Sequence, residues 1–313
     1  MTQRRRVPPA CLVLGGAGLI VVLMLALALV WRQMHAPVAG SAVAAAPAAT
    51  EPEIAAFSPE QLLAEQARND WLVHRLRGDE AVLVIEFPSL EQQGLALNRV
   101  AALIEKKGGS RVSVLNDEQL QALIKSTGDD TATFYFGHDY TAADLARFYT
   151  LAFSQGIVLN ANETRLRQQL LDASLLSQTA VGQFTGADPG ALVTFSATQP
   201  NDPRTQLDES VDPLRRASVM SHELSHGRYF TDKTYREHCW FFWTSLLNDH
   251  ERTLWRNYLA TQGYDMHAED LMVNETQALL MHTPDGRDFN AKELHLSDAE
   301  LEGLRERFRL GLK

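Results

Sequence analysis

The first two thirds of the chain alternate between helix-type and strand-type hydrophobic spacing. Apolar residues recur with helical period in four segments, residues 59–77, 89–108, 141–156 and 162–177. Short runs rich in β-branched and aromatic residues predict strands at residues 81–88, 131–137 and 190–197. Thr141 is well placed to cap the third helix. This half is therefore predicted to contain a small sheet together with helices.

The remainder of the chain reads almost entirely as helix. Helical spacing dominates from about residue 210 to residue 282, and an amphipathic helix is predicted from Ser297 onward. There is no internal repeat, which argues against a solenoid. The order of elements predicts an α+β fold with a small N-terminal sheet region and a mainly helical C-terminal half. A cleft between these two parts is a natural place for a functional site.

The N-terminus carries a different pattern. Residues 7–31 are uncharged and mostly apolar, which is long enough to cross a bilayer. The Ala/Pro-rich stretch that follows has too few large apolar residues to fold. The expected organisation is a cytoplasmic tail at residues 1–6, a transmembrane anchor at 7–31, a linker at 32–56 and a folded domain at 57–313.

The charges around residues 7–31 predict an orientation. Arg4, Arg5 and Arg6 precede the apolar segment, whereas Arg32 alone follows it closely. This asymmetry places the N-terminus in the cytoplasm and the C-terminal domain in the periplasm or outside the cell. A cleaved signal peptide is the alternative, because "SAVAAAPAA" offers cleavage sites, but the apolar run is longer than a usual signal peptide requires.

Composition and charge narrow the class of protein. A chain of 313 residues with 45% hydrophobic residues can bury a full core. The formal net charge is −10, and all 39 acidic residues lie from Glu51 onward, so nucleic acid is not an expected partner. Cys11 lies in the apolar segment and Cys239 stands alone beyond it, so no disulfide is expected between them.

The stretch "VMSHELSHGRYFTD", residues 219–232, carries the candidate chemistry. The helix that contains it is predicted to begin with Asp212 as N-cap and Pro213 at the first position, and to end at Gly227. His222 and His226 are four residues apart, so their imidazoles project from the same face about one turn apart. Two ring nitrogens at this spacing can share one zinc ion.

The segment "HELSH" resembles the HExxH signature of the zincin metallopeptidases. The resemblance implies that His222 and His226 are zinc ligands and that Glu223 is the general base. In that chemistry zinc lowers the pKa of its bound water and polarises the scissile carbonyl, while the carboxylate transfers the proton. The alternative is a solvated helix face that happens to carry two histidines.

A catalytic zinc usually needs a third protein ligand, and Glu275 is the best candidate. Its neighbours three and four residues away are apolar, namely Leu271, Met272, Ala278 and Leu279. An ionised carboxylate on such a face is costly unless a cation or metal pairs with it. A glutamate preceded by asparagine on a downstream helix resembles the third ligand of gluzincins. The spacing from His226 is longer than in the thermolysin pattern, and a buried ion pair with an arginine such as Arg252 is the alternative.

Two further residues enter the candidate site. Asp232 is a rival third ligand, because metzincin-like enzymes place theirs six residues after the second histidine. That motif needs a glycine at the position that Tyr229 occupies here. Asp232 is therefore expected to be the N-cap of the following helix and not a metal ligand. His282 lies two turns after Glu275 and is the expected stabiliser of the transition state, with Tyr264 and His267 among the weaker options.

These features together predict a membrane-anchored, zinc-dependent metallopeptidase that hydrolyses peptide bonds by attack of a zinc-bound water. Its expected partners are a peptide or protein substrate and the membrane, through the N-terminal helix. The alternative is a non-catalytic zincin-like domain that binds or scaffolds in the cell envelope. A third hypothesis is a membrane-tethered solute-binding domain without metal.

Overall fold

The computed structural model describes residues 54–310 and residue 312, which belong to one compact unit. The expected tail and anchor, residues 1–31, lie outside the described residues, as does the linker up to residue 53. Within the described part of the chain, no helix is long and apolar enough to cross a membrane. The predicted fold class included a transmembrane helix, and this part of the prediction is corrected. The described residues form an α+β domain with a mixed sheet.

The centre of the domain is a five-stranded mixed sheet with the order β1-β2-β3-β7-β4. Its strands are β1 (Ala56–Phe57), β2 (Leu72–Leu76), β3 (Asp79–Phe87), β4 (His138–Thr141) and β7 (Ala191–Ser196). The pairs β1·β2 and β3·β7 are parallel, whereas β2·β3 and β4·β7 are antiparallel. A separate two-stranded hairpin consists of β5 (Leu176–Ala180) and β6 (Gln183–Gly186). Strand β4 therefore lies at an edge of the main sheet.

Alternation along the central strands gives the sheet two buried faces. In β3, Leu83, Ile85 and Phe87 belong to one hydrophobic cluster, whereas Val82 and Val84 belong to another. The first face is covered by helices that follow the sheet strands in sequence: α3 (Leu90–Ile104), α5 (Ala142–Ser154) and α6 (Ala161–Asp172). The second face is covered by α7 (Pro213–Thr231) and the short α2 (Pro59–Ala64).

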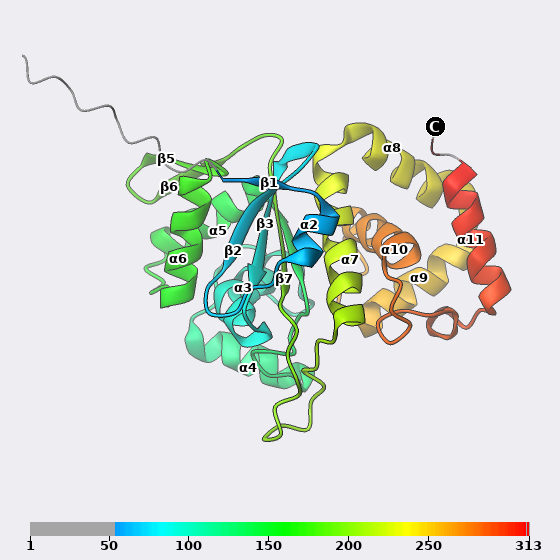
Figure 1. Cartoon of the computed structure of the whole chain (residues 1–313), viewed down its shortest axis with the longest axis horizontal. Coiled ribbons are helices and arrows are strands. Elements are labelled where there is room, and N and C mark those ends of the chain that lie inside the picture. The colour runs from blue at the N-terminus through cyan, green and yellow to red at the C-terminus, as the bar shows by residue number, and fades with distance from the viewer. Residues whose placement is uncertain (1–53, 311, 313) are drawn as a thin grey trace, which may run out of the picture. The chain divides into compact units, whose positions relative to one another are not determined.

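Helix α7 separates the sheet from the helical half of the domain (Figure 1). That half contains α8 (Lys233–Phe241), a π-helical turn at Phe242–Leu246, α9 (Asp249–Thr261), α10 (Glu269–His282), a 3₁₀ turn at Ala291–Leu294 and α11 (Asp298–Leu310). Its core is rich in aromatic side chains, including Tyr235, Trp243, Trp255 and Phe308. Residues 272–280 of α10 are buried on every side of the helix. A helix enclosed in this way can hold a polar side chain in a fixed position.

The helix starts follow the expected capping rules. The side chains of Ser89, Thr141 and Asp212 accept hydrogen bonds from backbone N–H groups at the starts of α3, α5 and α7. Helix α7 nevertheless passes through Gly227, its predicted end, and continues to Thr231. A Cβ at position 227 would lie 3.0 Å from a methyl group of Val82, so this glycine lets the helix approach the sheet.

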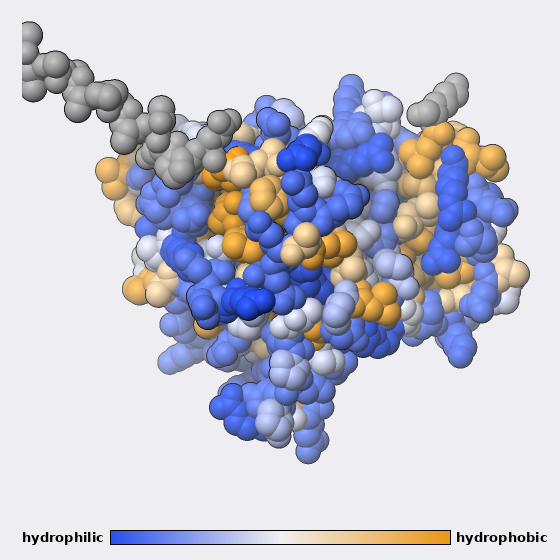
Figure 2. Space-filling model, in the orientation of Figure 1, coloured by the Kyte–Doolittle hydropathy of each residue, from blue (hydrophilic) through white to orange (hydrophobic). Residues whose placement is uncertain are grey.

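Other boundaries differ from the sequence prediction. Residues 59–77, predicted as one helix, form α2 and then β2, which pairs with β3. The strand predicted at 131–137 begins only at His138. Helix α4 (Asp117–Thr127) was not predicted. The predicted combination of a sheet with helices in this half is nevertheless present, as a five-stranded main sheet covered by helices on both faces. Figure 2 shows that polar residues cover most of one face of the domain, with hydrophobic residues in separate patches.

Candidate metal centre

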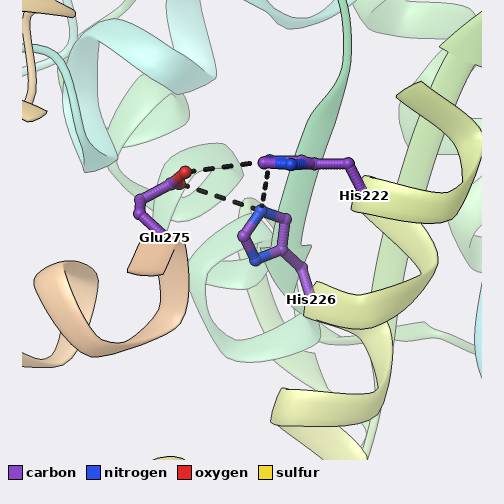
Figure 3. A group of neighbouring side chains, drawn as sticks. All are labelled: His222, His226 and Glu275. Carbon is purple, nitrogen blue, oxygen red and sulfur yellow. Dashed lines mark hydrogen bonds and ion pairs between the residues drawn. The ribbon is translucent and has the colours of Figure 1, made fainter. Parts of the chain in front are cut away.

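Helix α7 carries three of the predicted site residues and is held firmly against the sheet. Met220 is buried in the cluster that contains the second sheet face, and Leu224 packs against the same cluster. His222 and His226 therefore project from another side of α7, toward α10. The apolar side of α7 thus packs against the sheet, and the side that carries the histidines faces α10 (Figure 3).

The structure brings His222, His226 and Glu275 together. The Nε2 atoms of the two histidines are 2.9 Å apart. Oε2 of Glu275 lies 3.7 Å from Nε2 of His222, and Oε1 lies 3.8 Å from Nε2 of His226. Figure 3 shows both imidazole rings reaching from α7 toward the carboxylate on α10. The three side chains thus point their ligand atoms at a common centre.

A hydrogen bond from His222 fixes which of its nitrogens faces this centre. Nδ1 of His222 lies 2.8 Å from Oγ1 of Thr283, and that hydroxyl donates to the carbonyl oxygen of Ala278 at 3.0 Å. Because the hydroxyl proton is already engaged, Nδ1 of His222 is the donor and Nε2 carries the lone pair. Thr283 therefore orients His222 in the way that outer partners of metal-bound histidines usually do.

Glu275 does not form the ion pair with arginine that was the alternative. Arg252 instead pairs with Asp249 and donates to the carbonyl oxygen of Leu247. Among the described residues, the basic side chains whose nitrogens lie within 4.0 Å of the Glu275 carboxylate are those of His222 and His226 alone. The carboxylate is 1% exposed and its Oε2 has no hydrogen-bond partner within the described chain. It is therefore a buried acidic group without a permanent positive charge beside it.

Glu223 lies beside the three converging residues. It is 5% exposed, and its Oε2 also lacks a hydrogen-bond partner in the described part of the protein. Gly137 backs the carboxylate from the segment that leads into β4. Burial, followed by the charges of Asp139, Glu275 and Glu105, raises the pKa of Glu223 well above its usual range. Glu223 is thus a buried carboxyl group next to the candidate centre, and its Oε2 is free to contact a ligand.

Two more carboxyl groups complete the cluster, and neither was among the predicted catalytic or metal-binding residues. Oδ2 of Asp139, on β4, lies 3.7 Å from Nε2 of His226. Glu105 caps the end of α3 and accepts a hydrogen bond from the Tyr140 hydroxyl at 2.9 Å. Burial is the main cause that raises the pKa of each. No motif marks either residue, because the fold brings them from elements far from α7 in sequence.

The donor set fits a zinc ion. Burial lowers the pKa of His226 to about 4 and that of His222 well below its usual range, so both imidazoles are neutral at neutral pH. Two imidazoles and a carboxylate are a common catalytic zinc set. Two ligand atoms of one tetrahedral zinc lie about 3.3 Å apart, close to the separations observed here. A cation at the centre would also satisfy the unpartnered oxygen of Glu275.

The candidate centre opens into a cavity of about 620 Å³. His222, Glu223 and Glu275 line it together with aromatic and basic side chains, among them Tyr135, Tyr258, Tyr264 and Lys106. Its volume lies within the range of small-molecule and peptide sites. The candidate ligands are therefore accessible to a substrate although they are largely buried.

The two remaining predicted residues lie elsewhere. His282 ends α10, does not line the cavity, and has its Nε2 3.1 Å from the hydroxyl of Tyr235. Asp232 is the N-cap of α8, where its side chain accepts a hydrogen bond from the backbone N–H of Tyr235 at 3.0 Å. Neither residue belongs to the groups of side chains that could share a metal ion in the described chain.

Comparisons with protein-family models, curated proteins and solved structures found no match to this chain.

Proposed function

We propose that this protein is a zinc-dependent metallopeptidase. The observation that supports it most is the convergence of His222, His226 and Glu275 on one centre at a cavity wall, with Glu223 beside them. This pairs a three-ligand set with a neighbouring free carboxylate, which is the arrangement that the HExxH resemblance implies.

The zinc ion, when bound, would supply Lewis acidity that polarises a peptide carbonyl and acidifies water. His222, His226 and Glu275 would hold it. The positive charge of a bound ion would lower the raised pKa of Glu223, and the ionised carboxylate would then accept the proton of the attacking water and deliver it to the leaving amine nitrogen. Its unpartnered oxygen is available for this role, and the contact with Gly137 fixes the position of the carboxylate.

Tyr135 is the proposed donor to the developing oxyanion, in place of His282. Its hydroxyl has no hydrogen-bond partner among the described residues, and the side chain lines the cavity. Burial raises the pKa of Tyr135 well above its usual range, so the hydroxyl keeps its proton and can donate it in a hydrogen bond. Tyr264 lines the same cavity, and burial raises its pKa as well.

One observation favours the second candidate, a non-catalytic metal-binding domain. Asp139 lies as close to Nε2 of His226 as Glu275 does, at 3.7 Å compared with 3.8 Å. If Asp139 were a fourth ligand, the centre would be closed, as structural zinc sites are. An open fourth position is therefore part of the proposed function.

The test replaces the proposed general base. Glu223→Gln should retain zinc, measured by elemental analysis, and lose peptide hydrolysis by on the order of a hundredfold or more in kcat/KM. The matched control is Glu237→Gln on the exposed face of α8, which should behave like the wild-type protein. If Glu223→Gln hydrolyses peptides as fast as the wild-type protein, or if the wild-type protein binds no zinc, the proposed function is wrong.

A further inference from the structure

Lys106 is a buried cation in the wall of the same cavity. It follows Glu105 at the end of α3 and is 4% exposed. Its Nζ lies 4.2 Å from the ring centre of Phe134 and 4.6 Å from that of Tyr135. These distances place the ammonium group over two aromatic faces, which attract a cation and restrict its movement.

The backbone around Lys106 is also fixed. Lys106 forms an isolated antiparallel bridge with Tyr264. The backbone N–H of Lys107 donates to the carbonyl oxygen of Gly263 at 2.9 Å. These contacts connect the end of α3 to the segment that follows α9. The ammonium group therefore has a defined place in the cavity before any ligand arrives.

The charge of Lys106 has no direct counterpart in the described part of the chain. Within residues 54–310 and 312, no carboxylate oxygen lies within 4.0 Å of its Nζ. Arg287 is the other lysine or arginine that lines the cavity, and it is paired with Asp212 and Asp285. An unpaired charge removed from water is costly, and of the two basic side chains that line the cavity Lys106 is the one without a carboxylate partner among the described residues.

We infer that Lys106 binds a carboxylate group of the substrate, an inference that rests on the proposed peptidase function. The chemistry favours a single carboxylate over a phosphate. One ammonium group offers one positive charge, whereas Asp129 and Asp288 line the same cavity and would repel a dianion. The carboxylate has two sources in a peptide: the free C-terminus of a short chain, or an aspartate or glutamate side chain.

Burial lowers the pKa of Lys106, and this effect exceeds the opposing effects of Asp129 and Glu105. A substrate carboxylate beside Nζ would offset that cost by pairing with the charged form. The pairing would therefore be stronger than a solvent-exposed one, in which water screens both charges.

Two pairs of peptides separate the two sources. One pair is acetyl-trialanine with a free C-terminal carboxylate or a C-terminal amide. The other pair is a C-terminally amidated acetyl-tripeptide with glutamate or glutamine in the middle. Binding of each is measured by calorimetry to the zinc-loaded full chain carrying Glu223→Gln, so that the peptides stay intact.

We expect the carboxylate member of one pair to bind about tenfold more tightly than its neutral partner. Lys106→Met should reduce this ratio to about one, and Lys106→Arg should keep most of it, which shows that the cavity still folds. The matched control is Lys107→Met, because Lys107 is the exposed neighbour. Its ratio should equal that of the parent protein.

The inference is overturned if neither pair shows a preference, or if Lys106→Met keeps the ratio of the parent protein. This readout is binding and not turnover, so it is separate from the test of the proposed function. If the protein binds peptides without hydrolysing them, the wild-type protein and Glu223→Gln will show the same lack of hydrolysis. The proposed function is then wrong, whereas the preference for a carboxylate can still be observed.

Discussion

The α-carbon of Gly137 lies so close to the carboxylate of Glu223 that no side chain fits between them. A Cβ at position 137 would lie 2.1 Å from Oε1 of Glu223 and 2.5 Å from its carboxyl carbon. The segment leading into β4 therefore sets the position of a side chain on α7. A substitution at position 137 can therefore separate the role of Glu223 from the binding of metal.

Gly137→Ala should displace the Glu223 carboxylate without removing a metal ligand. A misplacement of about 1 Å lowers catalysis by on the order of a hundredfold, so kcat/KM should fall by that order while zinc affinity changes little. Gly286→Ala is the control, because a Cβ there meets no atom within 4 Å. Unchanged kcat/KM in Gly137→Ala would contradict the role assigned to Glu223.

Thr283→Val should weaken metal binding from outside the ligand set. The substitution removes the oxygen that accepts the hydrogen bond from Nδ1 of His222 while keeping the branched shape. Loss of such a partner typically lowers metal affinity by about tenfold to a hundredfold. Competition with a zinc chelator measures the affinity, and Thr283→Ser should restore most of it. Equal zinc affinity in Thr283→Val would contradict the orienting role assigned to Thr283.

Asp139→Ala distinguishes an open centre from a closed one. If Asp139 is only a neighbour of His226, the variant should lower zinc affinity by no more than about tenfold through lost charge attraction. The measurement is the same chelator competition, with Glu306→Ala at an exposed position of α11 as a comparison for the effect of net charge. A decrease as large as that caused by removing His226 would indicate a fourth ligand and would favour the non-catalytic candidate.

A buried ion pair away from the cavity allows a prediction about stability. Nε of Arg99 lies 2.7 Å from Oε1 of Glu163, and both side chains are 1% exposed. Glu163→Met removes one partner and leaves a buried guanidinium paired only with Asp117 and a backbone carbonyl. The free energy of unfolding should fall by about 3 kcal/mol, measured by urea denaturation. The exposed Glu118→Met should cost less than about 1 kcal/mol, and equal costs would contradict this packing of α3 against α6.

Local signals predicted much of the fold. Helices α3 and α5 begin where Ser89 and Thr141 can cap them, and β3 and β7 coincide with continuous apolar runs. The segment at 59–77 was predicted wrongly as one helix because pairing of β2 with β3 overrides its helical spacing. The end of α7 was missed because Gly227 serves close packing against Val82 rather than termination.

The residues of the candidate site also fall into two groups, those that the sequence indicated and those that only the structure revealed. His222, Glu223 and His226 occur within one helix, so their spacing alone indicated a shared centre. Glu275 was found because an acidic residue stood on an apolar face. Asp139, Glu105 and Lys106 were not among the predicted site residues. The tertiary fold of β4 and of the end of α3 brings Asp139 and Glu105 to the ligand cluster and Lys106 to the cavity wall.

The most direct measurement of the central claim is zinc affinity of Glu275→Ala compared with Asp232→Ala, by chelator competition on the purified full chain. The wild-type protein and Asp232→Ala should each bind one zinc ion per chain with the same affinity. Glu275→Ala should lose at least a hundredfold in affinity, because a ligand is removed and not merely an outer partner. Full zinc affinity in Glu275→Ala would contradict the assignment of His222, His226 and Glu275 as the metal centre.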